Sequence, residues 1–394
     1  MTGYDPVFPQ DAALTGIYVH VPFCRGRCNY CGFVTYPHHP DLEENYVKAL
    51  TREIDLWAQT EVLPTHSRSF QVDTLYFGGG TPSILRPASI AQLIDAWQER
   101  FEVVPDPEIT VEINPATVKV EQLKHLRRAG VNRASLGIQS FEDHELIAMG
   151  RRHNASDALI VFEDARVAGF DNISIDLIAG FPGQSMASLR RSLETALDLN
   201  PEHLSIYLLE VKEGTELQSR IREGLMQAPD DDLAASLYEY ICETVKRAGY
   251  EHYEISNFAR HGYFSRHNLK YWQDATYIGL GAAAHGMIGR HRYSNVQDLD
   301  RYGQLLAEGQ LPFHSFTELT PENRFRDALI MGARLVQGVD LQLLGNRYNI
   351  DVETFVRGTV GDLEDSGLFT MDGGRLALTP RGRLLSNVIF ARWV

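Results

Sequence analysis

Three of the four cysteines in the chain lie close together, at Cys24, Cys28 and Cys31, with the spacing C-x3-C-x2-C. Thiolates are soft ligands, and three of them on one tight loop suit an iron–sulfur cluster or a zinc ion. A cubic cluster has four irons, so three cysteine ligands would leave one iron open to another group. Zinc would need a fourth ligand, for which His20 and His38 are candidates. The cysteines alone leave both metals open.

Bulk composition bounds the class of protein. The chain has 394 residues, 44% of them hydrophobic and 23% charged, as in a soluble globular protein with one large α/β domain and an appendage. Its net charge of −15 argues against nucleic acid or an anionic membrane as a main partner. No secretory signal opens the chain and no apolar run is long enough to span a bilayer, so we expect a cytoplasmic protein with at most peripheral membrane contact. Cys242, in an apolar helical pattern, is expected to be a small buried residue and not a disulfide partner.

The first half of the chain shows a regular alternation of elements. Between Gly16 and about Glu210, short apolar runs alternate with amphipathic stretches, in six β/α units. Such units predict parallel strands joined by right-handed crossovers. A closed eightfold barrel needs two more units, so the predicted fold class is α/β with a partial (β/α)6 barrel, whose active groups lie at the carboxyl ends of the strands. The strands are predicted over residues 17–21, 72–77, 108–113, 133–138, 172–178 and 203–209. The helices are predicted over residues 41–57, 87–100, 118–129, 154–168 and 185–199.

The rest of the chain is predicted to form two further parts. After a loose lead-in over 1–15 and the barrel over 16–210, we expect an intermediate α/β segment over 211–312 and a C-terminal domain over 313–394. Helices followed by a hairpin predict a winged-helix-like α+β unit at the end. Acidic and basic residues nearly balance there, which favours packing or partner docking over DNA binding. The helices of this unit are expected over residues 321–337, 341–347 and 352–365, and the hairpin over 368–378.

Two glycine-rich segments invite a functional interpretation. Gly78-Gly-Gly-Thr81 follows the second predicted strand, where bare backbone N–H groups can receive a carboxylate or a phosphate. It is not a P-loop, because no Gly-Lys-Ser/Thr follows. The segment from Tyr277 to His285 mimics a dinucleotide fingerprint at Gly279, Gly281 and Ala284, but it lacks the βαβ context. Close backbone packing is therefore the expectation for this second segment.

The cysteine segment after the first strand and the Gly-Gly-Gly-Thr-Pro after the second, in an array of six β/α units, together resemble the radical S-adenosylmethionine (SAM) superfamily. The resemblance covers about residues 16–210. It favours a [4Fe–4S] cluster at Cys24, Cys28 and Cys31 over zinc. It also implies that the open iron binds the amino and carboxylate groups of SAM. An electron from the reduced cluster then breaks a carbon–sulfur bond and yields a 5′-deoxyadenosyl radical.

A narrower resemblance covers most of the chain. It points to the branch that holds oxygen-independent coproporphyrinogen III dehydrogenases and the haem chaperones of the HemW family. The segments that carry it are Tyr18-Val-His-Val-Pro-Phe-Cys24, Gly137-Ile-Gln-Ser-Phe141, Gly150-Arg-Arg-His-Asn154 and Gly180-Phe-Pro-Gly-Gln184.

This narrower resemblance implies SAM contacts at strand ends. Gly79, Gly80 and Thr81 would meet the amino end of the methionine portion of SAM. The carboxyl groups of Glu112 and Asp176 suit the amino group and the ribose hydroxyls. Each of these acids can also be explained as the partner in a buried ion pair. The assignment to SAM is therefore supported by the set of residues at one rim and not by either acid alone.

Further SAM contacts are implied by polar and aromatic residues. Gln139 can bond the ribose or the carboxylate of SAM, and Arg151 can pair with that carboxylate. Tyr18 and Tyr30 would flank the adenine or the cluster. The alternatives are a buried ion pair for Arg151 and a place in the core for Tyr18.

Two features of the resemblance separate the haem chaperones from the dehydrogenases. The dehydrogenases would have a fourth cysteine where this chain has Phe33. The block His267-Asn-Leu-Lys-Tyr-Trp272 resembles the H-N-x-x-Y-W block of HemW proteins, which implies haem binding at His267. Without the resemblance, a histidine bonded inside a packed turn would be favoured. The expected function is therefore haem binding and delivery to acceptor haemoproteins of respiration, with an electron donor for the cluster. His20, His153 and His285 are expected to be structural or to support residues that contact the bound groups.

The chain also departs from the pattern of the HemW family. Ser265 stands where a cysteine would precede Arg-His-Asn, and Gly32 replaces an expected aspartate after Cys31. The segment around Gly32 also resembles the pattern of radical SAM methyltransferases that degrade haem. Two enzymatic alternatives stay open. One is oxidative decarboxylation of the propionates of coproporphyrinogen III, and the other is radical methylation with opening of the haem ring. Phe33 and the His267 block argue against the first.

Overall fold

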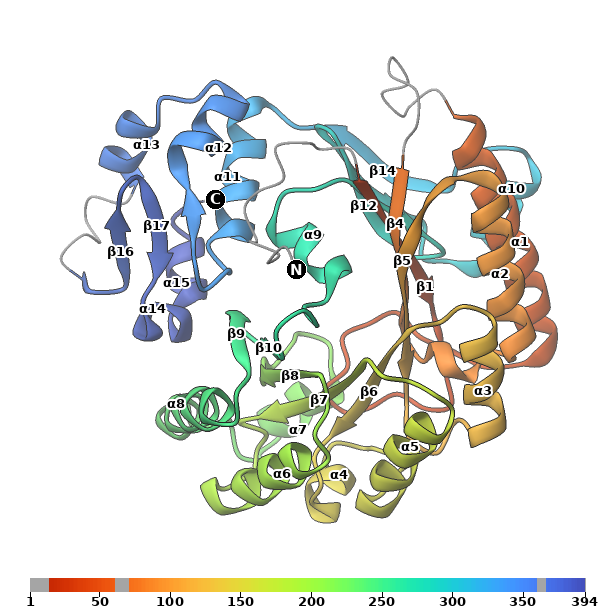
Figure 1. Ribbon diagram of the computed structural model, residues 1–394, viewed down its shortest axis with the longest axis horizontal. Coiled ribbons are helices and arrows are strands. Elements are labelled where there is room, and N and C mark those ends of the chain that lie inside the picture. Colours follow the sequence, from red (N-terminus) through yellow and green to blue (C-terminus); the bar gives the residue numbers. More distant parts are fainter. Residues whose placement is uncertain (1–13, 61–70, 360–365, 394) are drawn as a thin grey trace.

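The computed structural model describes residues 14–60, 71–359 and 366–393, and its main feature is a sheet built around parallel strands (Figure 1). The described strands of this sheet follow the order β14-β13-β12-β11-β1-β4-β5-β6-β7-β8-β10-β9. The pairs from β1 to β8 are parallel, and helices connect these strands, which confirms the predicted partial (β/α)6 barrel. The six strands are β1 (Leu14–Val21), β4 (Gln71–Gly79), β5 (Glu102–Ile113), β6 (Arg133–Gln139), β7 (Ile173–Ala179) and β8 (His203–Leu208).

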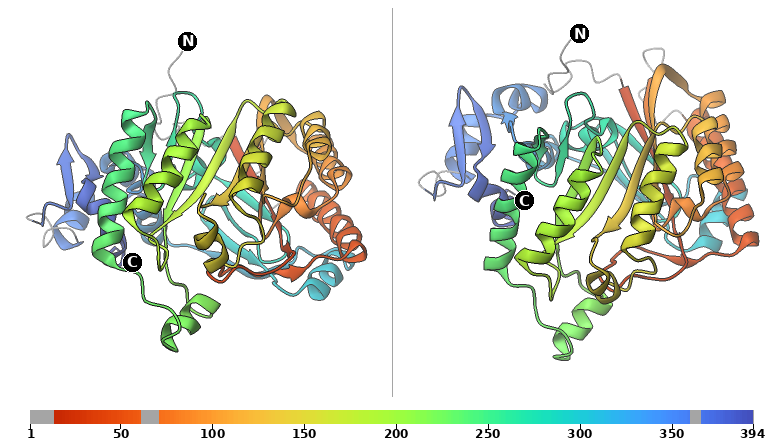
Figure 2. Two further views of the ribbon diagram at one scale, coloured as in Figure 1. Left: turned by 90° about the horizontal axis from the view of Figure 1, so that it is seen from below. Right: turned by 60° about the horizontal axis from the view of Figure 1, so that its bottom comes forward.

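Helices cover the outer face of these strands (Figures 1 and 2). Alternate strand residues such as Ile17 and Val19 point to this face and are buried against apolar helix residues that include Trp57 and Trp97. The strand residues between these, which include His20, point to the other face and place polar and aromatic side chains inside the barrel. The connecting helices are α1 (Pro40–Gln59), α2 (Pro87–Arg100), α3 (Val120–Arg128), α4 (Asp143–Ala148), α5 (Ala155–Val167) and α6 (Met186–Asp198).

The sheet extends beyond the six strands at both edges. β11 (Tyr277–Leu280) pairs with β1 in parallel, and antiparallel strands follow it. At the other edge β10 (Asn257–Ala259) and β9 (Glu251–Glu254) are antiparallel. The outer antiparallel strands are β12 (His285–Ile288), β13 (His291–Asn295) and β14 (Phe313–Glu318). The division of the chain at 210 and 312 stays a prediction, and β14 lies in the large sheet.

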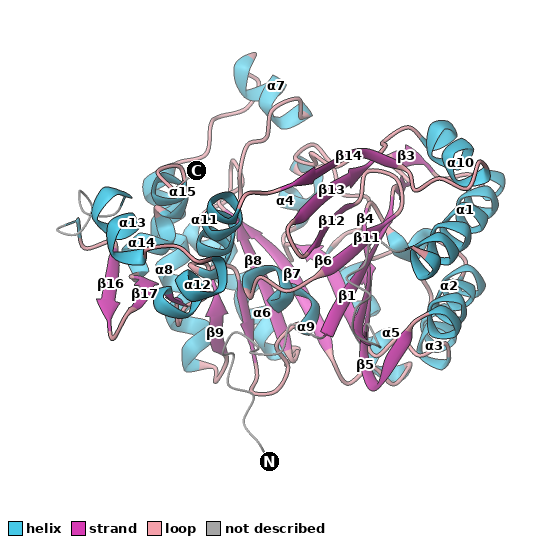
Figure 3. Ribbon diagram, turned by 90° about the horizontal axis from the view of Figure 1, so that it is seen from above, coloured by secondary structure: helices cyan, strands magenta, loops and turns pink. Residues whose placement is uncertain are grey.

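Several smaller elements lie beside the barrel. A two-stranded sheet of β2 (Phe23–Cys24) and β3 (Tyr36–Pro37) flanks the cysteine loop. α7 (Glu216–Arg222) follows β8 and lies apart from the sheet (Figure 3), before α8 (Asp231–Arg247). α10 (Leu299–Ala307) packs beside α1.

The C-terminal elements form a separate hydrophobic cluster, to which Phe325, Leu376 and Trp393 belong. They comprise helices and the three-stranded sheet β15-β17-β16, as in a winged-helix-like unit. The last part of the helix predicted over 352–365 lies outside the described residues. The elements are α11 (Pro321–Gly332), β15 (Val339–Asp340), α12 (Leu341–Tyr348), α13 (Val352–Thr359), β16 (Phe369–Asp372), β17 (Arg375–Leu378), α14 (Pro380–Leu384) and α15 (Ser386–Phe390).

The glycines of the segment from Tyr277 to His285 pack closely against other backbone. A Cβ atom on Gly279 would collide with the carbonyl oxygen of His285. Gly281 has a φ of +101°, and a Cβ atom there would lie 2.6 Å from the carbonyl oxygen of His20. These close approaches explain why small residues occur in this segment, so dinucleotide binding is not needed to explain them.

We expect Gly279→Ala to lower the free energy of unfolding by about 1–3 kcal/mol, because the added methyl group overpacks the contact with His285. Gly303, in the middle of α10, has open space around its Cβ position and serves as the control. Gly303→Ala should be neutral or raise the free energy of unfolding by about 0.5–1 kcal/mol. Urea denaturation measures both values. Equal stability of the two variants would contradict this explanation of Gly279.

Candidate functional site

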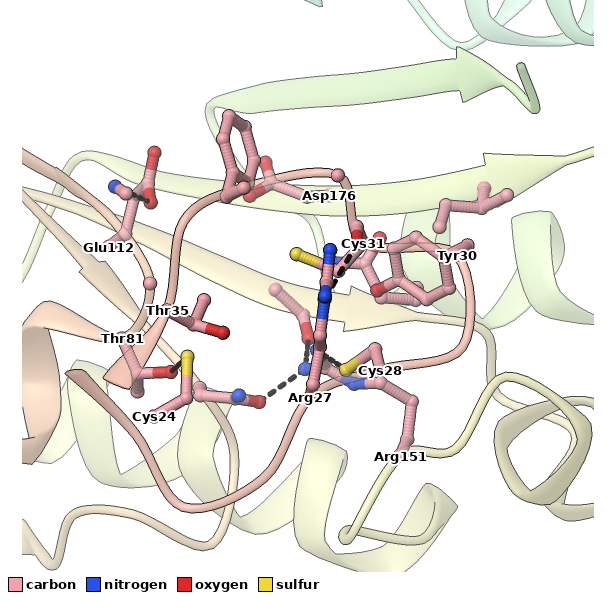
Figure 4. Close-up of a pocket in the computed structure, with 18 of the residues that line it drawn as sticks. Cys24, Arg27, Cys28, Tyr30, Cys31, Thr35, Thr81, Glu112, Arg151 and Asp176 are labelled. Carbon is pink, nitrogen blue, oxygen red and sulfur yellow. Dashed lines mark hydrogen bonds between the residues drawn. The ribbon is translucent and has the colours of Figure 1, made fainter. Parts of the chain in front are cut away.

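A cavity of about 470 Å³ opens at the carboxyl ends of the parallel strands. It brings together every residue predicted to hold the cluster or SAM except Tyr18 (Figure 4). These residues are Cys24, Cys28, Tyr30, Cys31, Gly79, Gly80, Thr81, Glu112, Gln139, Arg151 and Asp176.

The three cysteines line this cavity. Among the described residues, no three His, Cys, Asp or Glu side chains are close enough together to hold a single metal ion. A zinc ion needs converging donors, whereas a cubic cluster takes each thiolate on a different iron and needs them spread. Neither His20 nor His38 lines this cavity. His38 lines a neighbouring pocket together with Cys24, and its Nε2 atom is 2.8 Å from a carboxylate oxygen of Glu43. Three thiols that line a cavity with room beside them fit a cubic cluster whose fourth iron is open to a ligand.

Two polar contacts hold the thiols of the loop. The Sγ atom of Cys24 lies 3.4 Å from the hydroxyl of Thr81, and the guanidinium of Arg151 donates to the Sγ atom of Cys28 at 3.6 Å. Burial raises the pKa of the thiols of Cys24 and Cys31. Binding of iron would therefore displace protons from these thiols.

The glycine run lies directly against the cysteine loop. The N–H of Gly80 donates to the carbonyl of Val21 at 2.8 Å, and a Cβ atom on Gly80 would lie 2.8 Å from the carbonyl oxygen of Phe23. Gly79 has a φ of +111°, and its N–H donates to the carboxylate of Glu112 at 3.2 Å. Glycine is required here because two backbone segments and an acidic side chain meet within contact distance.

Two acids form the inner wall of the cavity. Glu112 accepts a hydrogen bond from the hydroxyl of Tyr76 at 3.0 Å, and Asp176 accepts from the hydroxyl of Ser135 at 3.1 Å. Burial, followed by the charge of Asp176, raises the pKa of Glu112 to about 7. Burial likewise raises the pKa of Asp176 to about 6, although the charge of Arg133 opposes this shift. A cationic or hydroxyl-bearing ligand would stabilise both carboxylates.

Arg151 and Gln139 also line the cavity, with Gln139 at the end of β6, the strand between those that carry the two acids. The guanidinium of Arg151 donates to the side-chain oxygen of Asn114 and to the carbonyl of Gly137, while its Nε has no partner among the described residues. Gln139 has a φ of +71°, at a register shift near the end of β6. A non-glycine residue in the left-handed region carries strain, which is typical of functional sites.

Some residues of the cavity were missed from the sequence. Asn114 follows Glu112 by two positions at the end of β5, so the strand-end rule would have found it. Tyr207 and Lys212 also line the cavity, from the end of β8 and the segment after it. The strand-end rule would have found Tyr207 as well, whereas Lys212 carried no signal of function.

Tyr18 lies beside the cavity and does not line it. Its hydroxyl is 3.1 Å from Nδ1 of His20, and its ring stacks on that of Tyr76 at 6.1 Å between centroids. Tyr76 in turn stacks on His267 at 5.1 Å. The aromatic residues thus separate His267 from the cavity.

His267 is buried inside the barrel on α9 (Arg266–Trp272), which fills the centre of the ring of elements in Figure 1. Its Nδ1 is 2.8 Å from the hydroxyl of Thr74 and its Nε2 is 2.9 Å from the hydroxyl of Tyr271. Burial lowers the pKa of His267 to about 3, so the imidazole is neutral. The carboxylate of Glu108 accepts from the backbone N–H groups of Arg266 and His267 at 3.0 Å each. Haem ligation at His267 stays a prediction, and in this conformation it would require one of the two ring contacts to break.

A partial barrel of six parallel strands with three cysteines after the first strand is the architecture of radical SAM proteins. The family model described as the Radical SAM superfamily matches residues 18–196, and that of the HemN C-terminal domain matches residues 319–385. The chain is 36% identical over 380 residues to the heme chaperone HemW of Bacillus subtilis (strain 168), with 96% of this chain and 98% of that protein covered. It is 37% identical over 387 residues to the heme chaperone HemW of Mycobacterium tuberculosis (strain ATCC 25618 / H37Rv), with 97% and 95% covered. The chain therefore belongs to the HemW family within the radical SAM superfamily.

The fold is shared with a solved structure, that of coproporphyrinogen III oxidase (HemN) from Escherichia coli. The match has a TM-score of 0.82 at 24% identity and covers 98% of this chain and 91% of that chain. Membership of the superfamily implies a [4Fe–4S] cluster and SAM. No helix in the described ranges is both long enough and apolar enough to cross a membrane.

Proposed function

We propose that this protein binds haem and transfers it to acceptor haemoproteins. Cys24, Cys28 and Cys31 hold a [4Fe–4S] cluster, and SAM binds in the cavity beside it. An electron donor reduces the cluster, which can then supply one electron to SAM. The observation that carries this proposal is the end-to-end similarity to proteins named heme chaperone HemW, at 36–37% identity.

The arrangement of the cavity supports the SAM portion of the proposal. In this proposal Arg151 pairs with the carboxylate of SAM, and Glu112 accepts from its amino group beside Gly79 and Thr81. Asp176 accepts from the ribose hydroxyls, and Gln139 bonds the ribose or the carboxylate. That all of these residues line one cavity supports these roles. Phe33, where the dehydrogenases of this branch would have a fourth cysteine, favours the chaperone over an enzyme that decarboxylates coproporphyrinogen III.

An anaerobic assay distinguishes these two functions. Protein with a reconstituted cluster would be given SAM, a reductant and coproporphyrinogen III, with Cys28→Ala as the control. We expect no protoporphyrinogen above this control, and we expect the same protein to bind haem and pass it to an apo-haemoprotein. Protoporphyrinogen formed together with 5′-deoxyadenosine would make the protein a dehydrogenase and overturn the proposal. Methylated, iron-free tetrapyrrole formed from haem would instead support the methyltransferase.

If His267 is a haem ligand, haem binding requires α9 to open first, because both ring nitrogens are engaged in the barrel. The observed rate of binding should then level off as the haem concentration rises. We expect His267→Ala to weaken haem binding at least tenfold and to shift the Soret band. The exposed His261, which pairs with Glu251, provides a control whose alanine variant should behave as wild type. An unchanged Soret band in a folded, SAM-binding His267→Ala variant would exclude this ligand.

A further inference from the structure

The mouth of the cavity has a different chemistry from its inner wall. Phe33, with 55% of its surface exposed, presents an aromatic face there, and Tyr207, 44% exposed, lines the cavity near one of the acids of the inner wall. The cations Arg27 and Lys212 are exposed at the same mouth, as is the acid Glu210. None of the residues that the SAM portion requires is among these five.

Neither cation forms a salt bridge with a described acidic side chain. Some exposed cations of the chain, such as Lys48, Arg191 and Arg247, pair with described carboxylates, whereas others, such as Lys246, do not. A chain with a net charge of −15 has acids in excess, so unpaired cations at a cavity mouth favour an anionic ligand. The carboxylate of Glu210, which lines the same cavity, would repel a ligand that carries many negative charges.

Lys212 is held in place by the cysteine loop. Its Nζ lies over the ring of Phe33, 5.7 Å from the centroid. Its aliphatic stem crosses Gly32, where a Cβ atom would lie 3.0 Å from Cδ of Lys212. A methyl group at position 32 would require this stem to shift by a few tenths of an ångström. The aromatic face and the cation therefore form one preassembled unit.

We propose that this unit is a tetrapyrrole subsite, in which a carboxylate of haem pairs with Lys212 and the macrocycle lies against Phe33 and Tyr207. The subsite rests on the proposed haem function, and it is separate from His267, which does not line the cavity. A flat apolar ring matches the two aromatic faces, and the ionised propionates match the cations. Arg27, whose Nε donates to the carbonyl of Cys31 at 3.1 Å, stands ready for a second propionate.

The test compares haem with its dimethyl ester, which keeps the ring and loses both charges. We expect Lys212→Glu to weaken haem binding about tenfold and to leave ester binding unchanged, since an exposed attraction becomes a repulsion. Phe33→Ala should weaken both ligands about threefold or more through lost ring contact. Lys246→Glu, an exposed lysine on α8 that does not line the cavity, is the charge-matched control and should change neither.

Iron content and SAM binding confirm that each variant keeps the rest of the site. Equal haem affinity of Lys212→Glu and wild type would overturn the subsite, and so would a Lys212→Glu variant that weakens haem and ester equally. Slower cluster reduction by an acidic electron carrier with unchanged haem affinity would assign Lys212 to donor docking instead. Failure of the wild type to bind haem would overturn the proposed function itself, and is distinct from these results.

Discussion

Replacement of Cys24, Cys28 or Cys31 by alanine is expected to remove iron and sulfide from the protein, whereas Cys242→Ala should retain both. The three cysteines line one cavity at the carboxyl ends of the strands, and loss of any one leaves an iron without its protein ligand. Cys242 lies on α8, packed against the main hydrophobic core, and does not line the cavity. It is thus a matched control for loss of a thiol.

Iron and sulfide analysis, together with the visible absorption of the anaerobically reconstituted protein, measures this effect. We expect equal amounts of iron and sulfide in wild type and Cys242→Ala, and almost none in the other three variants. Stoichiometric zinc in place of iron, lost in the same three variants, would support the zinc alternative. A Cys28→Ala variant with full iron and sulfide would contradict the proposed ligand set.

Glu112→Gln is expected to weaken SAM binding about 30-fold or more at pH 8, because it removes a buried carboxylate proposed to face the amino group of SAM. Wild-type affinity should also depend on pH. The pKa of Glu112 is about 7 in the free protein, so above this pH the carboxylate is charged and ready to bind. Below pH 7 the acid must lose a proton when SAM binds, and the affinity should fall towards about tenfold for each pH unit. Burial raises the pKa of Asp176 to about 6, so protonation of this second acid should steepen the fall in SAM affinity below pH 6. The positive charge of Arg133 opposes the rise in the pKa of Asp176.

Calorimetric titration of SAM between pH 5.5 and 8 measures both effects. The Glu112→Gln profile should be flat near pH 7, because the titrating group is gone. Glu121→Gln, which removes an exposed acid on α3, should reproduce the wild-type profile. A Glu112→Gln variant with wild-type affinity at pH 8 would place the amino group of SAM elsewhere in the cavity.

The sequence by itself determined the features that depend on local patterns. Alternating apolar periodicities predicted the six parallel strands and their helices, and the strand-end rule then placed the cysteines, Gly79, Glu112 and Asp176 at one rim. This succeeded because each signal is contained in a short stretch of chain. The structure confirmed the barrel and gathered these residues around one cavity.

Only the tertiary structure decided the features that depend on contacts between distant segments. α9 enters the barrel and packs His267 against Thr74 and Tyr76, although 193 positions separate His267 from Thr74. Tyr18 turns towards these rings and away from the cavity, and Lys212 crosses the cysteine loop over Gly32. Burial also sets the raised pKa of Glu112, and burial is a property of the assembled barrel. No local periodicity encodes such contacts, since they arise only when the strands and the inserted helix come together.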